Sequence, residues 1–269
     1  MTDITIGQYF PGNSPLHKLD ARMKIILMLI LMVSVFICRS YWALILAFVF
    51  TFAVVFISQI KLKVIFKGLK PILVIVLFTT ILNLFYGSGE VLVKLGILKI
   101  TENGINNAVF MSVRIILLVI QGLMLTYTTT PTSLTDAMES LMKPLKLLKI
   151  DTHSIAMTMT IALRFIPTLT EEVDKIMSAQ KSRGADIDSG GIIKRAKAII
   201  PVLIPLFISS FRRADELSDA MECRCYRGGE GRTKMKVMHL ALRDYASFIL
   251  VCVYFAAVVL IRVFMNNVI

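Results

Sequence analysis

Five apolar runs, separated by polar segments, constrain the fold of this chain more than any other feature. They cover 25–38, 42–57, 71–86, 108–127 and 245–263. A helix of about 20 apolar residues crosses the hydrocarbon core of a bilayer. The runs therefore predict an all-α integral membrane protein with about five transmembrane helices.

The first run is the shortest, and its helix would reach about 21 Å where the hydrocarbon core measures about 30 Å. It spans the membrane if Met23 and Lys24 extend it and the Lys24 ammonium snorkels to the surface. A re-entrant hairpin with the second run is the alternative. Residues 1–24 are rich in turn-forming residues and read as a polar arm, not as a cleaved signal peptide.

Composition supports the membrane interpretation and excludes other classes. Hydrophobic residues make up 56% of the 269-residue chain and charged residues 18%, with a formal net charge of +12. Disorder requires low hydrophobicity, and a nucleic-acid-binding domain would not need so much apolar surface, so no nucleic-acid partner is expected. The four cysteines show no disulfide framework.

The distribution of Lys and Arg predicts the orientation in the membrane. The arm, the loop 58–70 and the segment 128–244 hold 25 of the 30 basic residues. Basic loops remain on the cytoplasmic side. We therefore expect a multi-pass protein of the plasma membrane with its N-terminus and 128–244 in the cytoplasm and its C-terminus outside.

Three regions follow from this pattern: the arm with four membrane helices (1–127), a cytoplasmic module (128–244), and a C-terminal membrane helix (245–269). The apolar stretches of the module, 154–169 and 198–211, are short and interrupted. Arg164 and Pro167 break the first, and Pro201 and Pro205 break the second. We expect a mostly helical module at the membrane surface. The outer loop 87–107 is β-branched around Gly96 and predicts a small hairpin or an interfacial helix.

The sequence predicts no catalytic, cofactor or metal site. His17, His153 and His239 lie outside the apolar runs, and the runs contain no Asp or Glu. The chain has no P-loop, and 228–234 reads as a flexible turn. Cys223 and Cys225 have no second pair that would complete a zinc site.

Arg114 is the clear charge inside an apolar run. A charge at this position in a membrane helix is a functional candidate. Because it lies near the outer end of its run, snorkelling to the outer surface is the favoured interpretation.

Two charged segments of the module share a helix-end pattern. Segment 171–184 begins with acidic and ends with basic residues, as the helix macrodipole favours, and Gly184 suits the residue after the helix. Segment 212–225 ends in a similar way. Each places an alanine four residues before an arginine, so the two side chains share one face: Ala179 with Arg183, and Ala220 with Arg224.

With these segments, the chain resembles the transmembrane T component of energy-coupling factor (ECF) transporters. The likeness covers essentially the whole chain and is carried by four segments: the arm GQYFPGNSPLHKLDARMK (7–24), ALRFIP (162–167), and the two Ala-Arg signatures AQKSRG (179–184) and AMECRC (220–225).

The resemblance implies a non-catalytic coupling subunit with long cytoplasmic coupling helices. It implies three kinds of partner: two ABC-type ATPase subunits, a substrate-binding S component for vitamin or metal uptake, and the lipid bilayer. The implied ATPase-contact residues are Ala179, Arg183, Gly184, Ala220, Arg224 and Cys225. A self-contained carrier or channel is the alternative function, although it would need more polar residues along the runs.

The second signature departs from the family pattern, because Cys225 stands where glycine is usual. Cysteine disfavours positive φ, so a left-handed cap is in doubt at this position. The helix is therefore expected to continue through Tyr226 and Arg227 to Gly228-Gly229.

Overall fold

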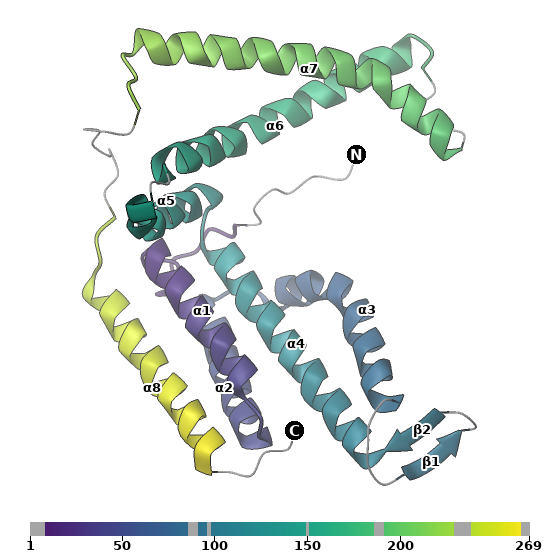
Figure 1. The fold of residues 1–269 in the computed structure, drawn as a ribbon, viewed down its shortest axis with the longest axis vertical. Helices are drawn as coiled ribbons and strands as arrows, with labels where there is room; N and C mark the ends of the chain where they lie inside the picture. The colour runs from purple at the N-terminus through teal and green to yellow at the C-terminus, as the bar shows by residue number, and fades with distance from the viewer. Residues whose placement is uncertain are drawn as a thin grey trace. The chain divides into compact units, whose positions relative to one another are not determined.

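The computed structural model describes residues 9–85, 91–95, 98–148, 151–185, 191–228 and 238–264. In this part of the chain the regular elements are helices apart from one hairpin (Figure 1), which confirms the all-α class. In chain order they are α1 (Ala21–Ile37), α2 (Tyr41–Ser58), α3 (Leu62–Phe85), β1 (Val91–Leu95), β2 (Leu98–Thr101), α4 (Glu102–Thr128), α5 (Pro131–Met142), the 3-10 helix η1 (Lys143–Leu148), α6 (Thr152–Ser182), α7 (Ile192–Cys223) and α8 (Leu242–Phe264). The chain divides into two compact units, one formed by Met1–Ala137 with Lys236–Ile269 and the other by Met138–Met235.

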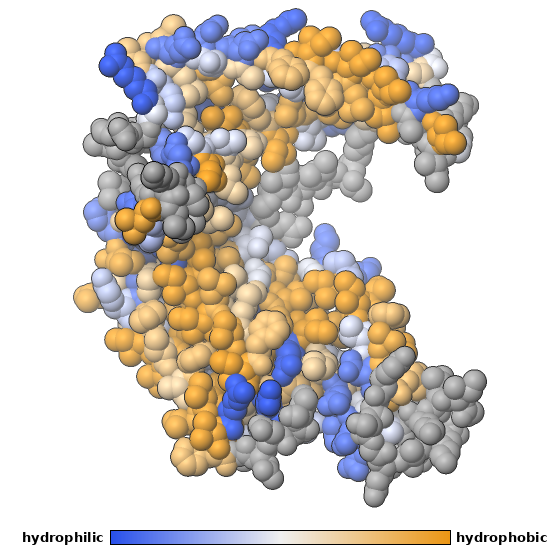
Figure 2. Space-filling model, viewed as in Figure 1, coloured by the Kyte–Doolittle hydropathy of each residue, from blue (hydrophilic) through white to orange (hydrophobic). Residues whose placement is uncertain are grey.

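Four described helices, α2, α3, α4 and α8, are long and apolar enough to cross a membrane. Helix α1 has 17 residues and packs against α2, α4 and α8, so it belongs to the same bundle. Hydrophobic residues cover the outer sides of this bundle, as Figure 2 shows for the face toward the viewer. The chain is therefore a multi-pass membrane protein, and the role of α1 as a fifth span stays a prediction.

Helix α4 is the centre of the membrane unit, because it packs against α1, α2 and α3. On one side, Phe110 and Leu117 are fully buried together with Val35 of α1 and Val258 of α8. On the other side, Tyr127 packs with residues of α2 and α3 in a second apolar cluster. One helix thus holds both halves of the core.

Helix α3 packs against α4 at a position where only glycine fits. A Cβ atom on Gly68 would collide with the Tyr127 hydroxyl and would lie 3.0 Å from a Leu123 methyl group. Farther along, Thr80 and Ser112 form a hydroxyl–hydroxyl hydrogen bond of 2.6 Å between the same two helices. The close approach at Gly68 fixes which side of α3 faces α4.

The arm packs at the end of the bundle where α1 begins and α4 ends. The Phe10 backbone N–H donates to the Tyr127 carbonyl at 3.0 Å. The Lys24 ammonium donates to the Thr128 carbonyl at 2.8 Å, and also to the His17 carbonyl and the Thr129 hydroxyl. Lys24 is 7% exposed, so the expected snorkelling is wrong: the last carbonyl of α4, with the His17 carbonyl and the Thr129 hydroxyl, gives the ammonium acceptors inside the protein.

Arg114 also binds protein. One guanidinium nitrogen donates to the carbonyl of Cys38, which ends α1, and the guanidinium carbon lies 4.8 Å from the centre of the Phe110 ring. A cation at a helix C-terminus is favoured by the macrodipole, and its stacking on an aromatic ring adds to this. Arg114 thus joins α4 to the end of α1. The sequence had instead favoured an arginine that snorkels to the outer surface.

The outer loop forms the predicted hairpin. Strands β1 and β2 pair antiparallel, with Lys94 opposite Lys99 and Leu95 opposite Leu98. Of the two expectations for this loop, the hairpin is confirmed.

Candidate partner-contact site

The candidate site lies on two long helices of the second unit, α6 and α7. Helix α6 continues through Pro167, and α7 continues through Pro201 and Pro205. The prediction that these prolines interrupt the apolar stretches is therefore wrong. Each proline removes one backbone donor, and the remaining hydrogen bonds and the packing of the two helices on each other are enough to keep them continuous. Glu171 and Glu172, expected in a first turn, consequently lie in the interior of α6.

Helices α6 and α7 cross in antiparallel orientation (Figure 1). Near the end of α6, the Gln180 amide donates to the Pro201 carbonyl at 3.4 Å. Earlier in α6, Glu172 forms an ion pair with Arg213 at 2.8 Å. Because a lower residue number on α6 meets a higher number on α7, the two helix C-termini point in opposite directions.

Helix α6 ends in a Schellman turn at the first signature. Gly184 adopts a φ of +85°, and its N–H donates to the Lys181 carbonyl at 3.0 Å. The Ala185 N–H donates to the Gln180 carbonyl at 3.0 Å. These two bonds satisfy carbonyls that the helix end leaves free. The prediction that this helix ends at Gly184 is confirmed.

Helix α7 ends in the same turn at the second signature. The Cys225 N–H donates to the Glu222 carbonyl at 2.8 Å, and the Tyr226 N–H donates to the Met221 carbonyl at 3.0 Å. Cys225 itself adopts a φ of +56°. The expectation that α7 continues to Gly228 is therefore wrong: the two capping bonds hold a cysteine in the left-handed conformation that glycine usually provides.

The two ends present the same group of residues to the surface. Arg183 and Arg224 are the cap residues of α6 and α7, and both side chains are exposed. The alanines four residues earlier, Ala179 and Ala220, are exposed as well, and so are Gly184 and Cys225. Each end thus offers a guanidinium beside a small residue, a surface that a partner can approach closely.

The structure keeps the two signatures apart. Arg183 lies one turn from Gln180, which contacts Pro201, whereas Arg224 ends α7 at the far side of the crossing. From Pro201 to Cys223, helix α7 extends by about 33 Å. The six predicted residues therefore form two matching groups, one at each end of the helix pair.

A second surface lies on α7, within the stretch 198–211 that the sequence marks as apolar but interrupted. Residues on one side of α7 recur at helical spacing, and each is more than two-fifths exposed: Ile200, Leu203, Ile204, Phe207, Ile208 and Phe211. Val202, on the opposite side, is buried. We call this set the apolar face of α7, and Figure 2 shows hydrophobic surface along this helix. Its three- and four-residue spacing was the signal that could have revealed it.

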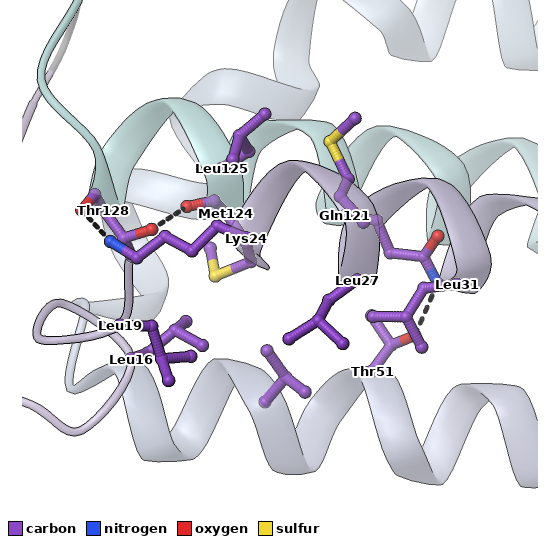
Figure 3. A pocket seen from close by; sticks show the side chains of 12 residues that line it. Leu16, Leu19, Lys24, Leu27, Leu31, Thr51, Gln121, Met124, Leu125 and Thr128 are labelled. Atoms are coloured by element: carbon purple, nitrogen blue, oxygen red, sulfur yellow. Dashed lines mark hydrogen bonds between the residues drawn. The ribbon is translucent and has the colours of Figure 1, made fainter. Parts of the chain in front are cut away.

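A metal site receives no support from the described residues. They contain no cluster of three or more His, Cys, Asp or Glu that could hold a metal ion. A cavity between α1, α2 and α4 is lined mostly by apolar side chains (Figure 3) and measures about 60 Å³. Two of its polar residues, Gln121 and Thr51, hydrogen-bond each other at 3.2 Å. Lys24 and Thr128 also line it. Ligand pockets usually measure about 300–1,000 Å³, so this cavity does not suit a vitamin-sized solute.

Comparison with known proteins gives a consistent result. The family model described as cobalt transport protein, CbiQ, matches residues 12–235. The energy-coupling factor transporter transmembrane protein EcfT of Ruminiclostridium cellulolyticum is 59% identical over 90% of this chain and 91% of its own length. The proteins of the same name from Clostridium kluyveri and Bacillus subtilis are 50% and 43% identical, over 93% and 97% of this chain and 95% and 99% of their own lengths. The chain belongs to the family of energy-coupling factor transporter transmembrane proteins.

Proposed function

We propose that this chain is the coupling subunit of an ECF-type importer. In this role it binds two ABC-type ATPase subunits and one substrate-binding S component, and it transmits ATP-driven motion to the S component during vitamin or metal uptake. The observation that carries the proposal is the pair of matching helix ends. Arg183 and Arg224 each close a long helix, each is exposed, and each follows a small residue by one turn.

The spacing of the two ends suits two ATPase subunits. Because α6 and α7 are antiparallel, one signature lies at each end of the pair, so each ATPase subunit can receive one arginine. A guanidinium binds carboxylates and carbonyls with several directional hydrogen bonds. Helices of 31 and 32 residues, crossed and held by an ion pair, can transmit a displacement without bending as a loop would.

The apolar face of α7 suits a membrane partner. Its side chains remain exposed although α7 packs against α6, so burying them requires an additional apolar surface. An S component embedded in the bilayer would supply such a surface. In this arrangement the module 128–244 lies on the cytoplasmic side, as the basic residues predict.

Co-purification tests the role of the arginines. We expect that Arg183→Glu combined with Arg224→Glu abolishes association with the ATPase subunits and stops uptake, whereas either single change leaves a weakened complex. Arg39→Glu, which alters an exposed arginine of the other unit, should leave the complex intact. Retention of both ATPase subunits and of uptake by the double variant would exclude this role.

Reconstitution tests the alternative of a self-contained carrier. The purified chain alone, in vesicles, should not move solute, because its function requires partners. Solute flux through the chain alone would instead support a carrier or channel.

A further inference from the structure

The start of α3 carries an unpaired basic surface. Lys61, Lys63, Lys67 and Lys70 are all exposed, and residues 58–85 contain no Asp or Glu. In the described part of the chain, none of these four side chains forms an ion pair or a hydrogen bond. Four neighbouring positive charges without compensation attract anions.

Three of the lysines lie on one face of the helix. Lys63, Lys67 and Lys70 are spaced by four and three residues, so their side chains project on the same side. Phe66, also on this side, is 67% exposed between them. We call Lys63, Phe66, Lys67 and Lys70 the lysine stripe.

The same face becomes apolar immediately after the stripe. Val74, Leu77, Phe78 and Ile81 continue the helical spacing and are exposed. A helix face that changes from exposed lysines to exposed aliphatic side chains marks the boundary between headgroups and hydrocarbon. Pro71 lies at this change, and Figure 1 shows that α3 bends along its length.

The packing of α3 fixes the direction of the stripe. The opposite face, with Ile65, Leu69 and Val76, is buried. Gly68 lies against Tyr127 and Leu123 of α4 so closely that the helix cannot turn without a collision. The lysines are therefore held toward the surroundings of the protein.

We propose that the lysine stripe binds the phosphate headgroups of anionic phospholipids at the membrane boundary. Charge complementarity selects this occupant, because the stripe offers ammonium groups at headgroup level directly above a lipid-facing apolar surface. Phe66 between them suits the interface, where one side of a ring meets hydrocarbon and the other meets headgroups. The proposal requires only a membrane-embedded chain and does not depend on the proposed function.

Tryptophan quenching by brominated lipids tests the proposal on the full chain in vesicles of phosphatidylcholine and phosphatidylglycerol. The chain has a single tryptophan, Trp42, which is exposed in the first turn of α2. The length of α2, about 27 Å, separates it from the stripe. The double variant Trp42→Phe/Phe66→Trp moves the reporter into the stripe.

We expect brominated phosphatidylglycerol to quench the tryptophan at position 66 more than brominated phosphatidylcholine does at equal mole fraction. The preference should be at least about fivefold, which is what one lysine contributes near an anionic surface, and it should decrease as salt is raised. The natural Trp42 should show no such preference. Equal quenching by both lipids at position 66 would overturn the proposal.

Two triple variants in the same reporter background separate charge from fold. Changing Lys63, Lys67 and Lys70 to Gln should remove the preference, and changing the same three to Arg should keep it. A preference that survives the Gln variant would assign it to other residues and would also overturn the proposal. Binding of an acidic protein instead of lipid would appear as equal quenching by the two lipids.

Discussion

Asp244, in the first turn of α8, accepts a hydrogen bond from the backbone N–H of Asp20, which caps α1, at 2.9 Å. Its second carboxylate oxygen accepts the Ala241 N–H at 2.7 Å, as the N3 residue of a capping box does. Asp244 is 1% exposed. One buried carboxylate thus begins α8 and joins it to the start of α1, residues separated by almost the whole chain.

The first prediction concerns this carboxylate. Asp244→Ala leaves two partly buried N–H donors without acceptors, so the free energy of unfolding should fall by about 1–3 kcal/mol. Asp244→Asn keeps one acceptor oxygen and should cost less. Unfolding temperature in detergent measures both variants, with Asp215→Ala, an exposed carboxylate of α7, as a control that should change little. An Asp244→Ala protein as stable as the control would show that Asp244 does not hold α8 to α1.

The second prediction concerns the contact of α3 with α4. Gly68→Ala should lower the free energy of unfolding by about 1–3 kcal/mol, because its Cβ collides with Tyr127. Gly122→Ala is the matched control: the nearest atom to its Cβ is a Met32 methyl at 3.7 Å, an ordinary contact. This second change should be neutral or stabilising by up to about 1 kcal/mol through helix propensity. Equal effects of the two substitutions would contradict the close approach at Gly68.

The membrane bundle was largely predictable from sequence, because hydrophobic burial in lipid leaves long apolar runs that need little tertiary information. The predicted run 42–57 lies within one residue of α2 at both ends. The run 71–86 matches only the second part of α3, because residues 62–70, expected in a loop, are helical. The direction in which individual charged side chains point was not predictable. Lys24 and Arg114 find carbonyls of other helices, and those contacts exist only after the helices have packed.

The long helices of the second unit were only partly predictable. The end of α6 was predictable from its Ala-Arg pattern and its glycine cap, whereas α7 was expected to continue past its own pattern. The prolines suggested helix breaks because proline disfavours a helix interior, and the sequence does not show that α6 packs against α7. The cap at Cys225 was missed for a similar reason, since residue preference disfavours positive φ while the hydrogen bonds of the turn impose it.

The third prediction is a pH dependence at Asp20. Burial raises the pKa of this carboxyl group. Hydrogen bonds from the Arg22 side chain and backbone, together with the charges of Arg22 and Lys24, lower it more, so the pKa of Asp20 lies below its ordinary value of 3.8. A lowered pKa in the folded state means that the stability it contributes is complete above 3.8 and is lost as pH falls through the shifted value.

Arg22→Gln removes the guanidinium that binds Asp20 at 2.9 Å. Near neutral pH this should lower the free energy of unfolding by about 1–2 kcal/mol, and the loss should shrink in acid, where Asp20 is protonated in both proteins. The unfolding temperatures of the natural protein and of the Arg22→Gln variant, measured from neutral pH into acid, test this expectation. A difference that stays constant down to the lowest pH would contradict the pairing with an ionised Asp20.

The fourth prediction concerns the two helix caps. Gly184→Ala introduces a Cβ at a φ of +85°, so it should destabilise the end of α6 by about 1 kcal/mol. Cys225→Gly relieves the same strain at a φ of +56° and should stabilise the end of α7 by a similar amount. Hydrogen exchange at the capping N–H groups of Ala185 and Tyr226 measures each end locally.

Gly191→Ala is the control for both caps, because Gly191 has a φ of −68° and no atom within 4 Å of its Cβ position. Because Gly191 caps the opposite end of α7, this change should leave hydrogen exchange at Ala185 and Tyr226 almost unaltered. If Cys225→Gly slowed exchange at Tyr226 and also strengthened ATPase binding, the cysteine would limit how firmly Arg224 is presented. Faster exchange at Tyr226 in this variant would instead show that the cysteine side chain stabilises the turn, and the strain argument for position 225 would be wrong.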